Sequence, residues 1–165
     1  MTLLRDGRFE RTDIWREGKW LDLWSVVHFL SGMSMGFCTS LVGFGVPESI
    51  IINFLLLVAY EMWEAMVQIH ETPQNRVMDV VVGMVSFLPT FLFVAPSLSG
   101  AAFILVFGIT FTVNITMAAF GWLASRKAIE LEIRLRQELK EQREKFKARR
   151  ARFLADRKRR REEKL

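Results

Sequence analysis

Long apolar stretches constrain this chain more than any other feature. They lie at about residues 23–45, 48–69, 77–96 and 98–124. Each is close to the roughly 20 residues that an α-helix needs to cross the hydrocarbon core of a bilayer. Because hydrocarbon offers no hydrogen-bond partners, a spanning segment must satisfy its own backbone, as a helix does. The sequence therefore predicts an all-α integral membrane four-helix bundle.

Helix-breaking residues separate the four stretches. The breaks contain Gly43, Gly45 and Pro47, then His70 to Arg76 with Pro73, then Pro96, Ser97, Ser99 and Gly100. Pro89 lies inside the third stretch and is expected to kink its helix, because proline removes a backbone donor. A re-entrant or strongly tilted segment is the alternative for this stretch.

Charge divides the chain into unequal parts. Residues 125–165 carry 17 Lys or Arg and 8 Asp or Glu, a net charge of +9, whereas residues 1–124 have a net charge of −4. We predict a cytoplasmic or interfacial arm at 1–22, a transmembrane domain at 23–124 and a charged, basic helical tail at 125–165. The single cysteine, Cys38, excludes a disulfide framework or a cysteine-based zinc site within one chain.

The N-terminal arm alternates charged residues with large apolar ones. This pattern fits a helix that lies on the membrane surface, with Trp15, Trp20 and Trp24 at the level of the lipid headgroups. A short charged arm with a tryptophan anchor is the alternative. We expect an interfacial helix here.

Positive residues in the short loops indicate the orientation, since such loops are retained in the cytoplasm. The arm has five Lys or Arg, the loop before the third stretch has Arg76, and the tail has many, whereas the other two turns have none. All these segments fall on one side if four helices span the membrane and both termini are cytoplasmic. The pattern favours a bacterial inner membrane.

The tail has the composition of an exposed helix. It contains no glycine or proline, and acids alternate with bases at helical spacings, as in Glu132–Arg136 and Glu141–Lys145. One helix is expected to continue the fourth span for roughly 50–60 Å, at 1.5 Å per residue. Its apolar stripe is too interrupted for a regular coiled coil. The basic residues expected to bind a partner or an anionic surface are Arg149, Arg150, Arg152, Arg157, Lys158, Arg159, Arg160 and Arg161.

Ionisable residues within the apolar region form the main candidate site, because such groups are costly in a membrane and mark functional positions by default. At 1.5 Å per residue, His28 lies roughly 9 Å from the cytoplasmic end of its span, Glu61 roughly 12 Å and Glu64 roughly 8 Å. Asp79 lies roughly 3 Å deep, and Asp22 borders the first span. We expect these groups to converge, with Glu61, Glu64, His28 and Asp79 as candidate catalytic residues.

Several chemical roles fit this cluster. Two neighbouring carboxylates in a low dielectric suit proton exchange, or acid–base catalysis on a substrate from the inner leaflet. Two Glu, one Asp and one His could also hold a divalent metal, although the Glu-x-x-His pairs of di-iron bundles are missing. Asp22 and Asp79 are also shallow enough to be interfacial anchors, and Asp79 could pair with Arg76 or favour the start of its helix. The sequence specifies no cofactor.

Three residues are candidates for helix packing. Gly32 and Gly36 form a small-xxx-small pattern on the face that carries His28, which allows another helix to approach closely. Asn114, near the middle of the fourth span, is expected to form hydrogen bonds with another helix.

Two segments carry a family resemblance. Glu61-Met-Trp-Glu64 and Asn75-Arg76-Val-Met-Asp79-Val-Val-Val-Gly83, preceded by Asp22 and His28, resemble the VanZ-like group of small polytopic membrane proteins. The resemblance covers residues 22–83. It departs from the group at Glu64, where Gln is more usual, and in the tail. It implies a polytopic fold with a polar cluster; one member confers teicoplanin resistance and most have no established activity.

Two classes of function remain. The first is an accessory or scaffold subunit of a larger membrane assembly, which docks partners through its basic C-terminal helix. The alternative is a VanZ-like intramembrane activity on a lipid-linked or amphipathic substrate at the cluster, or a proton-coupled carrier. Expected partners are membrane lipids and a protein or a second copy of the chain, with anionic headgroups as an alternative. Nucleic acid is disfavoured because aromatic residues are sparse in the tail.

Overall fold

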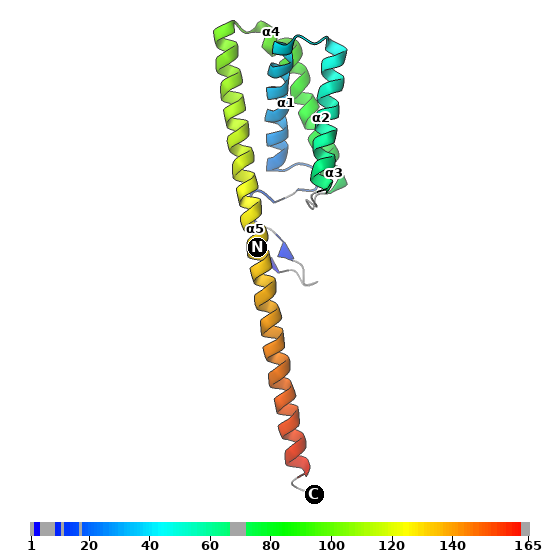
Figure 1. Ribbon diagram of the computed structural model, residues 1–165, viewed down its shortest axis with the longest axis vertical. Helices are drawn as coiled ribbons and strands as arrows, with labels where there is room; N and C mark the ends of the chain where they lie inside the picture. The colour runs from blue at the N-terminus through cyan, green and yellow to red at the C-terminus, as the bar shows by residue number, and fades with distance from the viewer. Residues whose placement is uncertain (1, 4–8, 11, 17, 67–71, 163–165) are drawn as a thin grey trace. The chain divides into compact units, whose positions relative to one another are not determined.

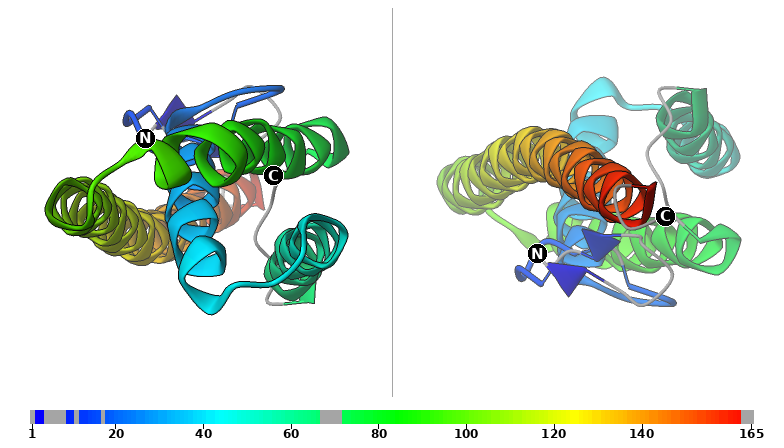
Figure 2. Two further views of the ribbon diagram at one scale, coloured as in Figure 1. Left: turned by 90° about the horizontal axis from the view of Figure 1, so that it is seen from above. Right: turned by 90° about the horizontal axis from the view of Figure 1, so that it is seen from below.

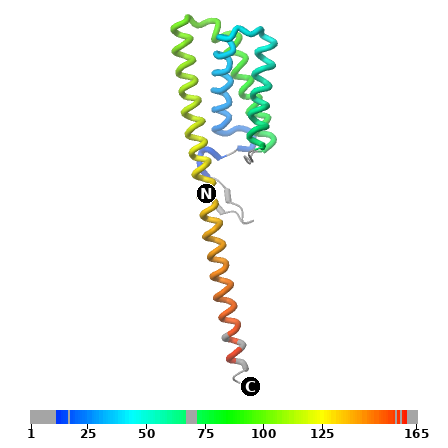
Figure 3. Tube along the Cα trace, viewed as in Figure 1, coloured from blue at the N-terminus to red at the C-terminus, as the bar shows by residue number. Residues whose placement is uncertain are grey.

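The computed structural model describes residues 2–3, 9–10, 12–16, 18–66 and 72–162 (Figures 1 and 3). Its elements are β1 (Thr2–Leu3), β2 (Phe9–Glu10), α1 (Leu23–Val42), α2 (Val46–Met66), α3 (Pro73–Pro89), the π-helical turn η1 (Thr90–Val94), α4 (Ala95–Ser97) and α5 (Gly100–Glu162). The chain forms two compact units, residues 11–125 and residues 1–10 with 126–165.

Among the residues that the structure describes, four helical segments are long and apolar enough to cross a membrane. They are Leu23–Val42, Val46–Met66, Pro73–Ser97 and Gly100–Ala155. This confirms the prediction of a helical protein with four segments able to span a bilayer. The large apolar side chains on their outer surfaces, such as Ile104 and Phe93, are exposed in the isolated chain and suited to lipid.

The prediction of an interfacial N-terminal helix is wrong for the part of the arm that the structure describes. β1 and β2 pair antiparallel, and residues 12–16 form a turn. The Asp13 carboxylate accepts a hydrogen bond from the Trp15 backbone N–H at 3.0 Å, and its carbonyl accepts one from Arg16 at 3.2 Å. Such local bonds compete with helix formation. Trp15 is also buried rather than exposed to headgroups.

The first span begins and ends at identifiable caps. Asp22 is the N-cap of α1, and its side chain accepts bonds from the backbone N–H groups of Trp24 and Ser25. At the other end Gly43 has a φ of 78°, a left-handed conformation that glycine adopts without a Cβ penalty. The short turn that follows reverses the chain into α2.

α1 packs mainly against α3, and glycine makes this approach close. A Cβ atom at Gly32 would collide with the Gly83 carbonyl oxygen and with Ser86 Oγ. One turn later, a Cβ at Gly36 would lie 2.9 Å from Thr90 Cβ. The small-xxx-small pattern therefore lies at a helix contact, where missing side chains let the backbones meet.

α2 also packs against α3. A Cβ atom at Gly83 would come within 2.8 Å of Leu57. Gly83 therefore contacts α1 through its carbonyl group and α2 through its Cα atom. Asn53 of α2 is fully buried, and its Nδ2 lies 3.2 Å from Met84 Sδ. Figure 2 shows α1, α2 and α3 side by side when viewed along their axes.

The apolar part of α5 contacts α1 at separate heights. Phe37 makes an edge-to-face contact with Phe103, with ring centroids 5.2 Å apart. Below it, Asn114 Nδ2 donates to Ser31 Oγ at 3.0 Å. Lower still, Gly121 leaves space for the indole rings of Trp15 and Trp24. Large side chains thus bridge a wider helix spacing than that between α1 and α3.

Pro89 changes the helix type. The α-helical pattern of α3 ends at this residue and continues as the π-helical turn η1. Proline has no N–H for the carbonyl one turn earlier, so the bonding pattern shifts. Thr90 stabilises the change, because its hydroxyl donates to the Ser86 carbonyl at 2.8 Å.

The unit that contains residues 126–165 is dominated by the charged part of α5. Arg136 pairs with Glu132, Lys145 with Glu141 and Lys147 with Glu144. The hydrogen bond from Lys147 lowers the pKa of Glu144. Exposed pairs of this kind add only a few tenths of a kcal/mol each, about 0.3–0.5, and mainly support helix formation.

Replacing Gly32 with alanine should destabilise the protein by about 1–3 kcal/mol, because the added methyl group overpacks the contact with α3. Thermal or denaturant unfolding in a fixed detergent measures this change. The matched control is Gly108→Ala in α5, where a Cβ meets nothing within 4 Å. Equal losses in the two variants would contradict a close α1–α3 approach at Gly32.

Candidate functional site

A polar network joins the start of α1 to the start of α3. Asp22 caps α1 through Oδ1, and its Oδ2 accepts hydrogen bonds from the Gly18 backbone at 2.8 Å and from Asn75 Nδ2 at 3.0 Å. The Thr72 hydroxyl donates to the Lys19 carbonyl at 3.0 Å and also caps α3. Two helix N-termini are thus tied together by the side chains that cap them.

Asp79 is the next member of this network and is only 1% exposed. Its Oδ1 accepts the Ser25 hydroxyl at 2.6 Å, and its Oδ2 lies 3.3 Å from Asn75 Nδ2. Asn75 therefore contacts both Asp22 and Asp79. The expectation that Asp79 is a shallow interfacial anchor does not match this burial, because α3 begins at Pro73 and carries Asp79 into its second turn.

His28 and Glu61 meet beside Asp79. His28 Nδ1 lies 3.4 Å from Glu61 Oε1, and both side chains are buried. The other carboxylate oxygen, Oε2, lies 3.8 Å from Arg76 Nε. Arg76 therefore contacts Glu61.

Three elements contribute one potential metal ligand each. Ligand atoms of His28 from α1, Glu61 from α2 and Asp79 from α3 all lie within 4.8 Å of one another, and all three residues are buried. Glu61 is 3% exposed. The structure thus brings together three of the four residues selected from the sequence, although they are far apart along the chain.

Glu64 lies at the edge of this group. It is partly exposed and interacts with the hydroxyl of Tyr60, one helical turn earlier. Tyr60 in turn makes an edge-to-face contact with His28, with ring centroids 5.5 Å apart. Glu64 is therefore linked to His28 through an aromatic ring.

Two buried polar residues were missed by the sequence reasoning. Ser25 is the third residue after Asp22 and forms a capping box with it, and this spacing is the sequence signal that could have identified Ser25. Asn53 lies eight residues before Glu61 on α2, and its Oδ1 has no hydrogen-bond partner among the described residues. A buried amide within an apolar stretch is the signal that could have identified Asn53.

The remaining predicted residues lie elsewhere in the fold. Asn114 bonds Ser31 as described above, and Gly32 and Gly36 line the α1–α3 contact. The basic residues of the tail lie in α5, and those whose side chains are described are exposed: Arg149, Arg150, Arg152, Arg157, Arg159 and Arg160. The side chains of Lys158 and Arg161 lie outside the described set.

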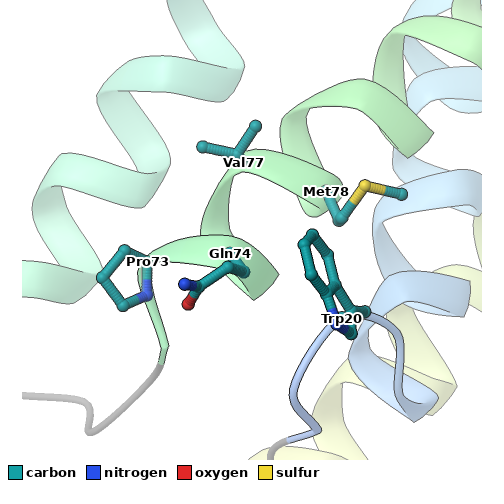
Figure 4. Close-up of a pocket in the computed structure, with 5 residues that line it drawn as sticks. All are labelled: Trp20, Pro73, Gln74, Val77 and Met78. Carbon is teal, nitrogen blue, oxygen red and sulfur yellow. The ribbon is translucent and has the colours of Figure 1, made fainter.

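A pocket of about 240 Å³ lies beside the first turns of α3 (Figure 4). It is lined by Trp20, Pro73, Gln74, Val77 and Met78. Figure 4 shows the Trp20 ring next to α3, beneath Met78. The lining is almost entirely apolar and includes none of the three clustered ligand residues, so the pocket suits an acyl chain better than a polar substrate.

The geometry of the cluster permits three chemical roles. It can lock the helices together, because the Ser25–Asp79 and His28–Glu61 contacts join different helices. It can share a proton between His28 and Glu61. It can also offer a nitrogen and two carboxylates to a cation.

Comparison with protein-family models, with curated proteins and with solved structures finds no match to this chain. The site must therefore be interpreted from its own chemistry.

Replacing Asn75 with alanine should lower the free energy of unfolding by about 1–3 kcal/mol, because it removes a donor shared by two carboxylates. Unfolding in a fixed detergent gives the value. Gln74→Ala, an exposed neighbour in the same turn, is the control. A double-mutant cycle with Ser25→Ala should be non-additive by more than about 0.5 kcal/mol; additive effects would argue against a connected network.

Proposed function

We propose that this protein is an accessory subunit of a larger membrane assembly and docks a protein partner through the part of α5 beyond Ser125. In this proposal four helices form a membrane-spanning bundle and both termini are cytoplasmic. A bacterial inner membrane is the proposed location. The single observation that carries the proposal is the exposure of large apolar side chains on a highly charged helix.

Phe146 is 75% exposed and Phe153 is 67% exposed. Lys and Arg surround them in the sequence, so this part of α5 is too charged to lie in hydrocarbon. Lipid acyl chains are therefore not expected to cover these two rings. Exposed aromatic residues with charged neighbours are typical of protein interaction surfaces.

The spacing of these residues suits a helical partner. Leu139, Phe146 and Phe153 recur every seven residues, which keeps them near one face of an α-helix. The flanking positions are rich in Arg and Lys, so the expected partner is a helix with an apolar face and acidic edges. A second copy of this chain is the competing occupant, since α5 also carries several acids.

Charge distribution supports the topology. The Lys and Arg of the arm, Arg76 and the basic tail fall on one side when four helices cross the membrane. The His28–Glu61–Asp79 group then lies in the cytoplasmic half, and α5 continues into the cytoplasm.

A second candidate function rests on that group. An intramembrane activity of the VanZ-like kind, on a lipid-linked or amphipathic substrate, would use Glu61 with His28 and Asp79, and Glu64 at the edge. The meeting of three buried ionisable side chains favours this candidate. The apolar pocket at Trp20 offers room for part of a lipid chain.

The docking proposal predicts that Phe146→Ser/Phe153→Ser abolishes partner co-purification from native membranes in nanodiscs, while the yield of folded protein is unchanged. The matched control is Ala148→Ser/Ala151→Ser, on roughly the opposite face of the same helix at 100° per residue. Quantitative mass spectrometry of co-purified proteins is the measurement. Loss of the same partners in both variants, or retention in both, would contradict docking on the Phe146 face.

The second candidate function predicts that activity depends on Glu61 and not on the partner. Glu61→Gln should remove a cell-based activity and leave partner co-purification intact, because Gln keeps the shape of the side chain and removes its charge. Thermal stability of the purified variant separates a chemical role from loss of the fold. Wild-type cellular function in a folded Glu61→Gln variant would eliminate this candidate.

A further inference from the structure

The geometry points to a divalent transition-metal site formed by His28, Glu61 and Asp79. This inference goes beyond the docking function and is independent of it, since it concerns α1, α2 and α3 and not the tail. The proposed ion is Zn²⁺ or a metal of similar ligand preference.

The distance between the first two ligands already fits a metal. Zn²⁺ binds histidine nitrogen and carboxylate oxygen at about 2.0–2.2 Å, and a tetrahedral arrangement then separates two ligand atoms by about 3.4 Å. His28 Nδ1 and Glu61 Oε1 are 3.4 Å apart. Asp79 completes a triangle whose sides are at most 4.8 Å, and metal binding would draw it inward.

The donor set selects the class of metal. One imidazole and two carboxylates are typical of Zn²⁺, Mn²⁺ and Fe²⁺ sites, whereas Mg²⁺ and Ca²⁺ prefer oxygen alone. Three protein ligands leave a further position for water or another ligand, as in catalytic zinc sites. A structural zinc site would more often supply four side chains.

Outer hydrogen bonds hold two of the ligands in place. The Ser25 hydroxyl and the Asn75 amide both donate to Asp79, at 2.6 Å and 3.3 Å. Arg76 approaches Glu61 at Oε2, which leaves Oε1 directed to His28. Ligating carboxylates in metal sites are commonly oriented by partners of this kind.

Charge supplies the driving force. Glu61 and Asp79 are almost completely buried, and Asp22 is connected to Asp79 through Asn75. Buried carboxylates are stable when paired or bound to a metal, and a divalent cation between Glu61 and Asp79 neutralises their mutual repulsion.

The test uses full-length protein without a histidine tag, in nanodiscs, after removal of metals with a chelator. Titration with Zn²⁺ in competition with a chelating dye should give one equivalent per chain. Co²⁺ should give the visible absorption bands of low-coordinate nitrogen–oxygen ligation. Zn²⁺ should also raise the unfolding temperature of the wild type, since an ion that binds only the folded state stabilises it.

The near-isosteric variants Glu61→Gln and Asp79→Asn should each weaken binding by at least 100-fold and abolish the rise in unfolding temperature. Ser25→Ala should weaken binding by about 10–100-fold, as expected for an outer-shell residue. Glu48→Gln, an exposed acid at the far end of α2, should bind like wild type.

Folded wild-type protein that takes up no Zn²⁺ or Co²⁺ would overturn the proposal. So would unchanged binding in folded Glu61→Gln and Asp79→Asn variants, or an equal loss of binding in Glu48→Gln. Partner co-purification through α5 is a separate readout, so failure of the metal site and failure of the docking function are distinguishable.

Discussion

The close approach of α1 and α3 at Gly32 and Gly83 is the constraint on which the rest of the membrane domain depends. A hydroxyl as short as that of Ser25 reaches Asp79 at 2.6 Å because the two helices approach closely. Asp79 of α3 also lies beside the contact between His28 of α1 and Glu61 of α2. If the helices were farther apart, these short polar side chains could not contact one another. Their charges would then be buried in an apolar environment without compensation, which costs free energy.

The membrane domain combines tight and loose helix contacts. α1 and α3 meet through glycine and small polar residues, whereas α1 and α5 meet through aromatic rings at Phe37 and Phe103 and through the Asn114–Ser31 pair. Backbones that touch gain directional packing and hydrogen bonds, which are the main sources of helix association in lipid. The aromatic rings between α1 and α5 fill a larger distance between the helices and restrict their geometry less. The polar group thus lies where the packing is most restrictive.

Part of this arrangement could be predicted from residue patterns. Stretches of about 20 apolar residues predicted four helices because few other structures satisfy a backbone in hydrocarbon. The similar depths of His28, Glu61 and Asp79 followed from the helical rise and the order of the predicted spans, and shared helix faces with the glycines suggested that they meet. The turn at residues 12–16 could not be predicted, since the bonds that Asp13 accepts from the Trp15 and Arg16 backbone compete with a surface helix. Nor could periodicity separate Glu61 from Glu64, because residues three apart lie only about 60° apart around a helix, and small differences in helix rotation decide which one is buried.

The burial of Trp15 has a consequence for how the chain is made. Its indole ring packs against Trp24 and into the space that Gly121 leaves in α5. Gly121 is synthesised more than a hundred residues after Trp15. During translation, therefore, the first three spans can enter the membrane and associate while this indole has no final position. The Trp15 ring can take its packed position only after the part of α5 around Gly121 has been made, so this contact is a late event of biogenesis.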